Sequence, residues 1–198
     1  KNAAPWERQA LIKARVSAGS SRLADDYDTL TAQIVYERPL PEDLRDEICR
    51  LRQRMEKELG QESAQHHNIK TGRGGMVDVE FLAQYLLLSH GRVHHELRCR
   101  NTIDTLHALH SKGLLPQADY DSLVNGYKFL RRLENKLRLV HDQSINQLDS
   151  DPESLGKLAR HLGYTEQAAQ PQQALLEEYS SVTQGIRTIF NRYLSHAD

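Results

Sequence analysis

The stretch KTGRGGMVDVEFLAQYLLL, residues Lys70–Leu88, joins a glycine-rich loop to a run of apolar residues. The apolar run is too long for a single buried strand, and its apolar positions fall on almost every side of a helix. Since a helix that is apolar nearly all round is a buried one, we expect residues 76–89 to form the central helix of the fold. Its narrow polar stripe, Glu80 and Gln84, then needs partners inside the protein or a cleft to face.

The rest of the chain has the same helical period. Apolar residues recur every three or four positions, and Pro and Gly mark the ends of the segments. We expect helices near residues 6–15, 26–36, 42–59, 76–89, 101–112, 117–141, 152–162 and 173–194. The sequence therefore predicts an all-α bundle of about eight helices. It forms a single domain, residues 1–198, with a possible seam at residues 60–75.

Charge and composition exclude several classes of protein. The 198 residues carry 26 Lys+Arg and 27 Asp+Glu, a net charge of −1, which argues against a nucleic-acid or membrane partner bound by bulk charge. No apolar run approaches the roughly 18 residues of a membrane-spanning helix, and the N-terminus has no hydrophobic signal segment. Cys49 and Cys99 lie far apart in the sequence and form no CxxC pair. We therefore expect both to be free thiols in a reducing compartment. We expect a cytoplasmic protein.

The histidines and carboxylates do not predict a metal site. The 10 histidines match no zinc pattern. On a helix, Asp78 and Glu80 point about 200° apart and cannot share an ion. On a strand they would share a face, as the D-x-[DE] pair of a nucleotidyltransferase core does. That core also needs a Gly-Ser helix start well upstream, whereas Gly75 lies three residues before Asp78. We therefore expect a helix here, with Asp78 in its first turn, where the helix dipole stabilises an anion.

The glycine loop leaves two interpretations open. Its glycines allow positive φ and the close approach of a ligand, and its cations stand before a helix that presents free N–H groups. The residues concerned are Lys70, Gly72, Arg73, Gly74 and Gly75. This arrangement suits a phosphate, but K-T-G-R-G-G matches neither phosphate-loop signature. A tight turn before a core helix is the alternative.

A second polar intrusion lies in the helix expected at residues 117–141. Glu134 falls inside the apolar arc of that helix, with Arg131 and Arg138 at i−3 and i+4 and Asn135 beside it. A carboxylate at a core position needs a cation, and either arginine can supply one. The set is either an ion pair that fixes helix register or a polar seam that faces an active-site cleft.

Three strings taken together resemble the glutamine synthetase adenylyltransferase family. They are WERQALIKAR (Trp6–Arg15), KTGRGGMVDVEFLAQYLLL (Lys70–Leu88) and YKFLRRLENKLRLVHD (Tyr127–Asp142). The resemblance implies a large cytoplasmic bacterial enzyme with two similar halves, each a nucleotidyltransferase domain followed by a helical domain. One half transfers AMP from ATP to a tyrosine of glutamine synthetase using Mg²⁺. The other half removes the AMP by phosphorolysis, and PII signal proteins and glutamine set the balance.

The chain lacks the Gly-Ser…Asp-x-Asp core of that enzyme. The resemblance therefore implies that this chain is only the helical domain, with no catalytic residue, no metal site, no bound cofactor and no activity alone. It also places the first helix and the glycine loop against the neighbouring nucleotidyltransferase domain. The first-helix residues at that interface are Trp6, Glu7, Lys13 and Arg15.

Several points stay open. The first string runs on to Ala18-Gly19-Ser20, where the family has Ala-Gly-Asp. Both halves of the enzyme carry these strings, so the half is undecided. The partners implied are glutamine synthetase, a PII signal protein and the neighbouring domain. The alternatives are a non-catalytic helical module that binds a PII-type regulator, and the related helical segment of a PII uridylyltransferase.

Overall fold

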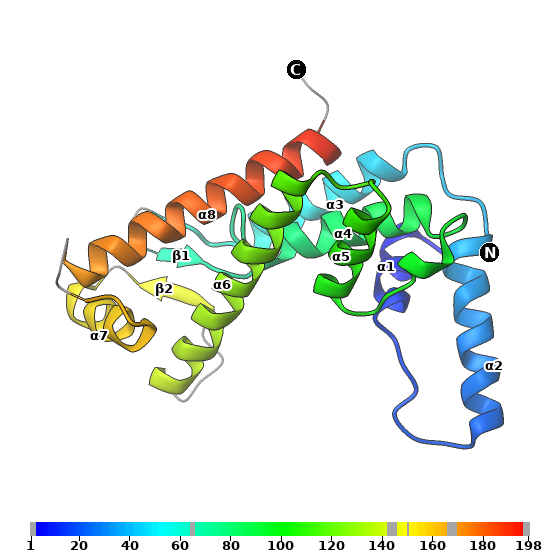
Figure 1. Ribbon diagram of the computed structural model, residues 1–198, viewed down its shortest axis with the longest axis horizontal. Coiled ribbons are helices and arrows are strands. Elements are labelled where there is room, and N and C mark those ends of the chain that lie inside the picture. The colour runs from blue at the N-terminus through cyan, green and yellow to red at the C-terminus, as the bar shows by residue number, and fades with distance from the viewer. Residues whose placement is uncertain (1–2, 64–65, 142–145, 150, 166–169, 196–198) are drawn as a thin grey trace.

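The computed structural model describes residues 3–63, 66–141, 146–149, 151–165 and 170–195, and Asp142 lies outside them. The α-helices in these residues are α1 (Pro5–Ile12), α2 (Ser21–Ala32), α3 (Leu44–Leu59), α4 (Met76–His90), α5 (Thr102–Ser111), α6 (Gln117–His141), α7 (Pro152–Leu162) and α8 (Pro171–Leu194). Two short turns of other helical types are η1 (Gln33–Glu37) and η2 (His95–Leu97). The prediction of a helical fold with about eight helices is confirmed (Figure 1).

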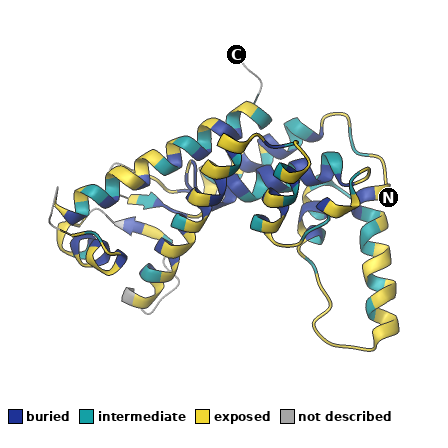
Figure 2. Cartoon of the chain, in the orientation of Figure 1, coloured by how far each residue is buried: buried dark blue, intermediate teal, exposed yellow. Residues whose placement is uncertain are grey.

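Helix α4 is the central helix, as its composition predicted. It packs against α3, α5, α6 and α8, and Val79 and Leu82 are fully buried. Figure 2 shows the buried residues gathered where these helices meet. The apolar run of residues 76–88 thus forms the centre of the core because most sides of the helix meet another element.

The first two helices differ from the expected boundaries. Helix α1 ends at Ile12 rather than Arg15. Helix α2 begins at Ser21, five residues before the expected Asp26, because the Ser20 hydroxyl accepts the Leu23 N–H at 3.4 Å and caps the helix. Both differences lie at helix ends, where apolar periodicity is a weak guide.

A two-stranded sheet joins distant parts of the chain. Strand β1 (His66–Asn68) pairs antiparallel with β2 (Gln147–Asp149), and His66 lies opposite Asp149. Three residues are too few to show a strand period, so the sequence did not predict these strands. The pairing fixes the segment before the glycine loop close to the segment after α6.

The helices form an elongated body with one projecting element. Helix α8 runs along one edge, α6 and α7 extend toward one end, and α2 projects at the other end (Figure 1). Helix α2 has no buried residue. None of the helices in the described ranges is both long enough and apolar enough to span a membrane.

Candidate functional site

A buried ion-pair network lies beneath the start of α4. Asp78 is fully buried. Its Oδ1 lies 2.5 Å from Nε of Arg52, and the two groups form an ion pair whose geometry is not that of a hydrogen bond. Its Oδ2 lies 3.2 Å from Nη1 of Arg187 on α8. Glu56 completes the network, with Oε2 3.4 Å from Arg52 and 2.8 Å from Arg187. Two guanidinium groups therefore balance two carboxylates.

This network holds the glycine loop. The Gly74 N–H donates to Asp78 Oδ2 at 2.8 Å, and Arg52 Nη2 donates to the Gly72 carbonyl at 2.7 Å. Asp78 thus satisfies a backbone donor at the start of α4, where the N-cap residue is a glycine without a capping side chain. The carboxylate connects α3, α8 and the loop at one point.

The glycines of the loop permit a close approach, and the group that approaches them is the backbone of the chain itself. Gly74 has φ +72°, and a Cβ there would lie 1.9 Å from the carbonyl oxygen of Thr183 on α8. A Cβ on Gly72 would lie 2.3 Å from the Asn68 carbonyl oxygen. Gly72 and Gly74 are therefore required for internal packing. Lys70 and Arg73 remain exposed beside them.

A basic cleft lies between the end of α1, the start of α5, and helices α4 and α6. Its volume is about 690 Å³. Six of its lining side chains are cationic, namely Lys13, Arg100, Lys128, Arg131, Arg132 and Lys136. Among the described residues that line it, Glu80 is the one carboxylate. A cleft with this charge excess attracts anions.

Glu80 connects two walls of the basic cleft. Its Oε2 lies 3.2 Å from Nζ of Lys13 on α1, and the Tyr127 hydroxyl on α6 donates to its Oε1 at 2.8 Å. Burial, and then the Glu80 carboxylate, raise the pKa of Tyr127 to about 12, so the phenol keeps its proton at neutral pH. The expected basic partner of Glu80 is therefore Lys13. Gln84, one turn further along α4, is partly buried.

Glu134 lies behind the same cleft. It is 1 % exposed, as expected, and accepts from Arg131 Nη1 at 2.8 Å and from Arg138 Nη2 at 2.9 Å. The two arginine side chains are about half exposed. Arg131 and Asn135 line the cleft, and the expected ion pair of Glu134 is present beside it. The interpretation as a seam that faces an active-site cleft stays a prediction.

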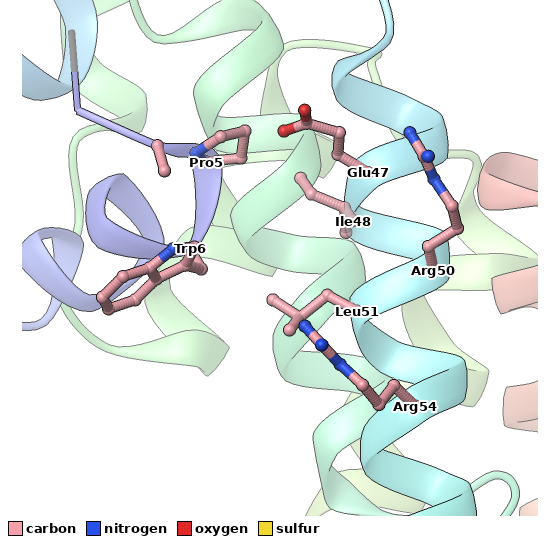
Figure 3. Close-up of a pocket in the computed structure, with 8 residues that line it drawn as sticks. Pro5, Trp6, Glu47, Ile48, Arg50, Leu51 and Arg54 are labelled. Atoms are coloured by element: carbon pink, nitrogen blue, oxygen red, sulfur yellow. The ribbon is translucent and has the colours of Figure 1, made fainter.

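A separate groove of about 520 Å³ lies between α1 and α3 (Figure 3). Trp6 is 57 % exposed and faces it from α1, while Leu51 and Arg54 line it from α3. Glu7 stabilises the start of α1, because its Oε2 accepts the N–H of the N-cap residue Ala4 at 2.7 Å. Arg15 is exposed beyond the end of that helix.

The structure thus divides the predicted site residues among three places. Lys13, Glu80, Arg131 and Asn135 meet in the basic cleft. Arg73 lines a different cavity, against α8. Trp6 faces the α1–α3 groove.

The sequence argument missed Arg52, Glu56 and Arg187. A signal was present for Arg52, since it follows Ile48 by four residues and precedes Met55 by three, and so lies on the apolar side of α3. A cation on such a face needs a buried partner. Nothing local identified Asp78 as that partner.

The sequence of the chain matches a known protein family. A family model described as GlnD PII-uridylyltransferase matches residues 42–194, more than half of the chain. The chain belongs to this family. The match covers α3 to α8, and therefore includes the buried network and most of the basic cleft.

Within this family, the chain is homologous over most of its length to bifunctional glutamine synthetase adenylyltransferase/adenylyl-removing enzymes, as the three strings indicated. It is 36% identical over 166 residues to the enzyme of Bradyrhizobium diazoefficiens, covering 83% of this chain and 17% of the relative. It is 38% identical over 157 residues to that of Mycolicibacterium smegmatis, covering 78% and 16%. For Leifsonia xyli subsp. xyli the identity is 33% over 190 residues, covering 94% and 18%. The chain spans about a sixth of the length of these relatives.

Proposed function

We propose that this chain is the helical domain of a cytoplasmic bifunctional glutamine synthetase adenylyltransferase/adenylyl-removing enzyme. The complete enzyme would transfer AMP from ATP to a tyrosine of glutamine synthetase and remove it by phosphorolysis, with a PII signal protein as regulator. Residues 1–198 would form one helical domain beside the nucleotidyltransferase domain. Its basic cleft would bind the nucleotide phosphates that the neighbouring domain presents.

The charge of the basic cleft carries this proposal. Of the six cations that line the cleft, Lys13, Arg100 and Arg131 pair with Glu80, Asp28 and Glu134. The other three, Lys128, Arg132 and Lys136, suit a ligand with several negative charges. Lys128 is exposed at the cleft, and the Tyr127 hydroxyl adds a neutral donor. In adenylyl transfer, charge develops on the phosphate oxygens, so fixed cations at this position would stabilise the transition state.

The basic cleft does not fit a magnesium site. Mg²⁺ prefers carboxylate and water oxygens, and the cleft's carboxylate, Glu80, already binds Lys13 and Tyr127. Magnesium would therefore be held by the neighbouring domain, and the helical domain would contribute charge and position. We accordingly expect the isolated chain to show no labelled AMP incorporation into glutamine synthetase. Turnover above the blank would contradict the proposal.

The cleft proposal is tested in the full-length enzyme with Lys128→Ala/Lys136→Ala. Each half-exposed contact to phosphate contributes about 0.5–1 kcal/mol, so the KM for ATP should rise about tenfold. The control is Lys157→Ala on α7, whose lysine pairs with Glu153 away from the cleft. An unchanged KM for ATP in the double variant would refute a phosphate-binding role.

We also propose that the glycine loop contacts the nucleotidyltransferase domain through Lys70. The Lys70 carbonyl accepts the Val77 N–H at 3.0 Å, so the backbone is fixed while the side chain stays exposed. In the full-length enzyme, Lys70→Ala should reduce adenylyl transfer by about tenfold or more without changing the melting temperature. If the rate stays within about threefold, the loop is only a turn.

A further inference from the structure

Helix α2 projects from the body of the molecule, and most of its residues are exposed (Figures 1 and 2). None of its residues is buried, and Leu23 and Leu30 are 67% and 54% exposed. A helix of 12 residues is marginal in water without tertiary packing. The helix is anchored at its C-terminal end, where it continues into η1 and the fully buried Val35. Its exposed surface therefore lacks a partner in the described part of the chain.

The leucines do not lie on the side of α2 that contacts the rest of the chain. Asp28 and Thr31 line a groove beside the start of α5, and Asp28 pairs with Arg100 at 2.7 Å. Leu23 and Leu30 lie roughly 80° or more around the helix from both of those residues. We call these two residues the α2 stripe. Its apolar surface is available to another partner.

Exposed apolar residues concentrate in this part of the molecule. Seven large apolar side chains are exposed among the described residues, and four of them fall within the first 30 residues: Trp6, Val16, Leu23 and Leu30. The family match begins at residue 42, after α1 and α2. The match to the Leifsonia xyli relative covers 94% of the chain and so includes most of this region. The region that holds α1 and α2 therefore lies outside the matched family model but is mostly shared with an adenylyltransferase relative.

We propose that the α2 stripe docks the nucleotidyltransferase domain of the same polypeptide, an inference that rests on the proposed function. The groove beside α2 and the basic cleft share Arg100 and Asn101. A domain that presents phosphates to the cleft would therefore lie next to α2. The stripe would hold that domain in place by apolar contact.

The size of the stripe favours a tethered partner over a second copy. An independent stable complex buries about 800 Å² on each partner, which two side chains of one short helix do not supply. A domain on the same polypeptide has an effective concentration on the order of millimolar, so a small contact suffices. The relatives are about six times as long as the matched region, which leaves room for such a domain.

The test is thiol accessibility at Leu30→Cys, with Cys49→Ala and Cys99→Ala removing the native thiols. The rate of modification by a maleimide is measured in the 198-residue chain and in the full-length protein. We expect modification to be at least about tenfold slower in the full-length protein, because docking covers the position. The control is Val93→Cys, at a position 77% exposed outside α2, which should react equally in both proteins.

Two results would overturn the docking proposal. Equal rates at Leu30→Cys in both proteins would show that nothing covers the stripe. Protection in the short chain that is lost on dilution would identify a second copy as the occupant. Adenylyl transfer, measured on the same full-length protein, separates the two proposals. Activity without protection rejects only the docking surface, whereas protection in a protein without transfer activity rejects only the proposed enzyme function.

Discussion

Asp78→Asn is expected to lower the free energy of unfolding by about 3–5 kcal/mol. The carboxylate is fully buried and faces two guanidinium groups, Arg52 on α3 and Arg187 on α8. Asparagine keeps the size of the side chain but removes its charge. Among the described residues, the fully buried Arg52 would then keep Glu56 as its counter-ion, at 3.4 Å. A buried cation left without full compensation is one of the few causes of so large a loss.

Urea unfolding of the 198-residue chain measures this effect, and the melting temperature should fall by about 10 °C or more. The matched control is Glu153→Gln, which breaks the exposed pair with Lys157. That change should cost less than about 1 kcal/mol. A similar loss for both variants would mean that the network at the start of α4 is no more important than a surface ion pair.

Gly74→Ala is expected to destabilise the chain by about 2–5 kcal/mol. Two effects add: a left-handed backbone costs an L-residue about 1–2 kcal/mol, and overpacking costs about 1–3 kcal/mol. The second effect arises because the new Cβ would lie 1.9 Å from the Thr183 carbonyl oxygen. Either α8 or the loop must move, and movement of the loop also disturbs the hydrogen bond to Asp78.

Gly113→Ala separates the two effects. Gly113 follows α5 with φ +71°, nearly the +72° of Gly74, but a Cβ there would meet nothing within 4 Å. We expect Gly113→Ala to cost only the backbone term, about 1–2 kcal/mol. The difference between the two unfolding free energies then measures the approach of α8 to the loop. If the two variants are equally stable, α8 does not approach the loop this closely.

The polar residues of this chain differ in how far their partners could be predicted from local spacing. The paired arginines around Glu134 were expected from i−3 and i+4 spacing, because partners on one helix are fixed by helix geometry alone. Glu80 was expected to need a basic partner, but Lys13 could not be named, since it comes from another helix 67 residues earlier. The two short strands were also missed, because their pairing depends on segments far apart in the chain.

The sequence by itself determined that the chain is helical, that residues 76–88 form its buried centre, and to which relatives it is similar. Each of these depends on local periodicity or on the order of residues in a string. Only the tertiary structure decided that Arg52, Asp78 and Arg187 meet, that α8 requires Gly74 to be a glycine, and that cations of α1 and α6 share one cleft. The physical reason is that periodicity specifies which side of a helix is buried, whereas the packing of whole helices specifies which buried sides face each other.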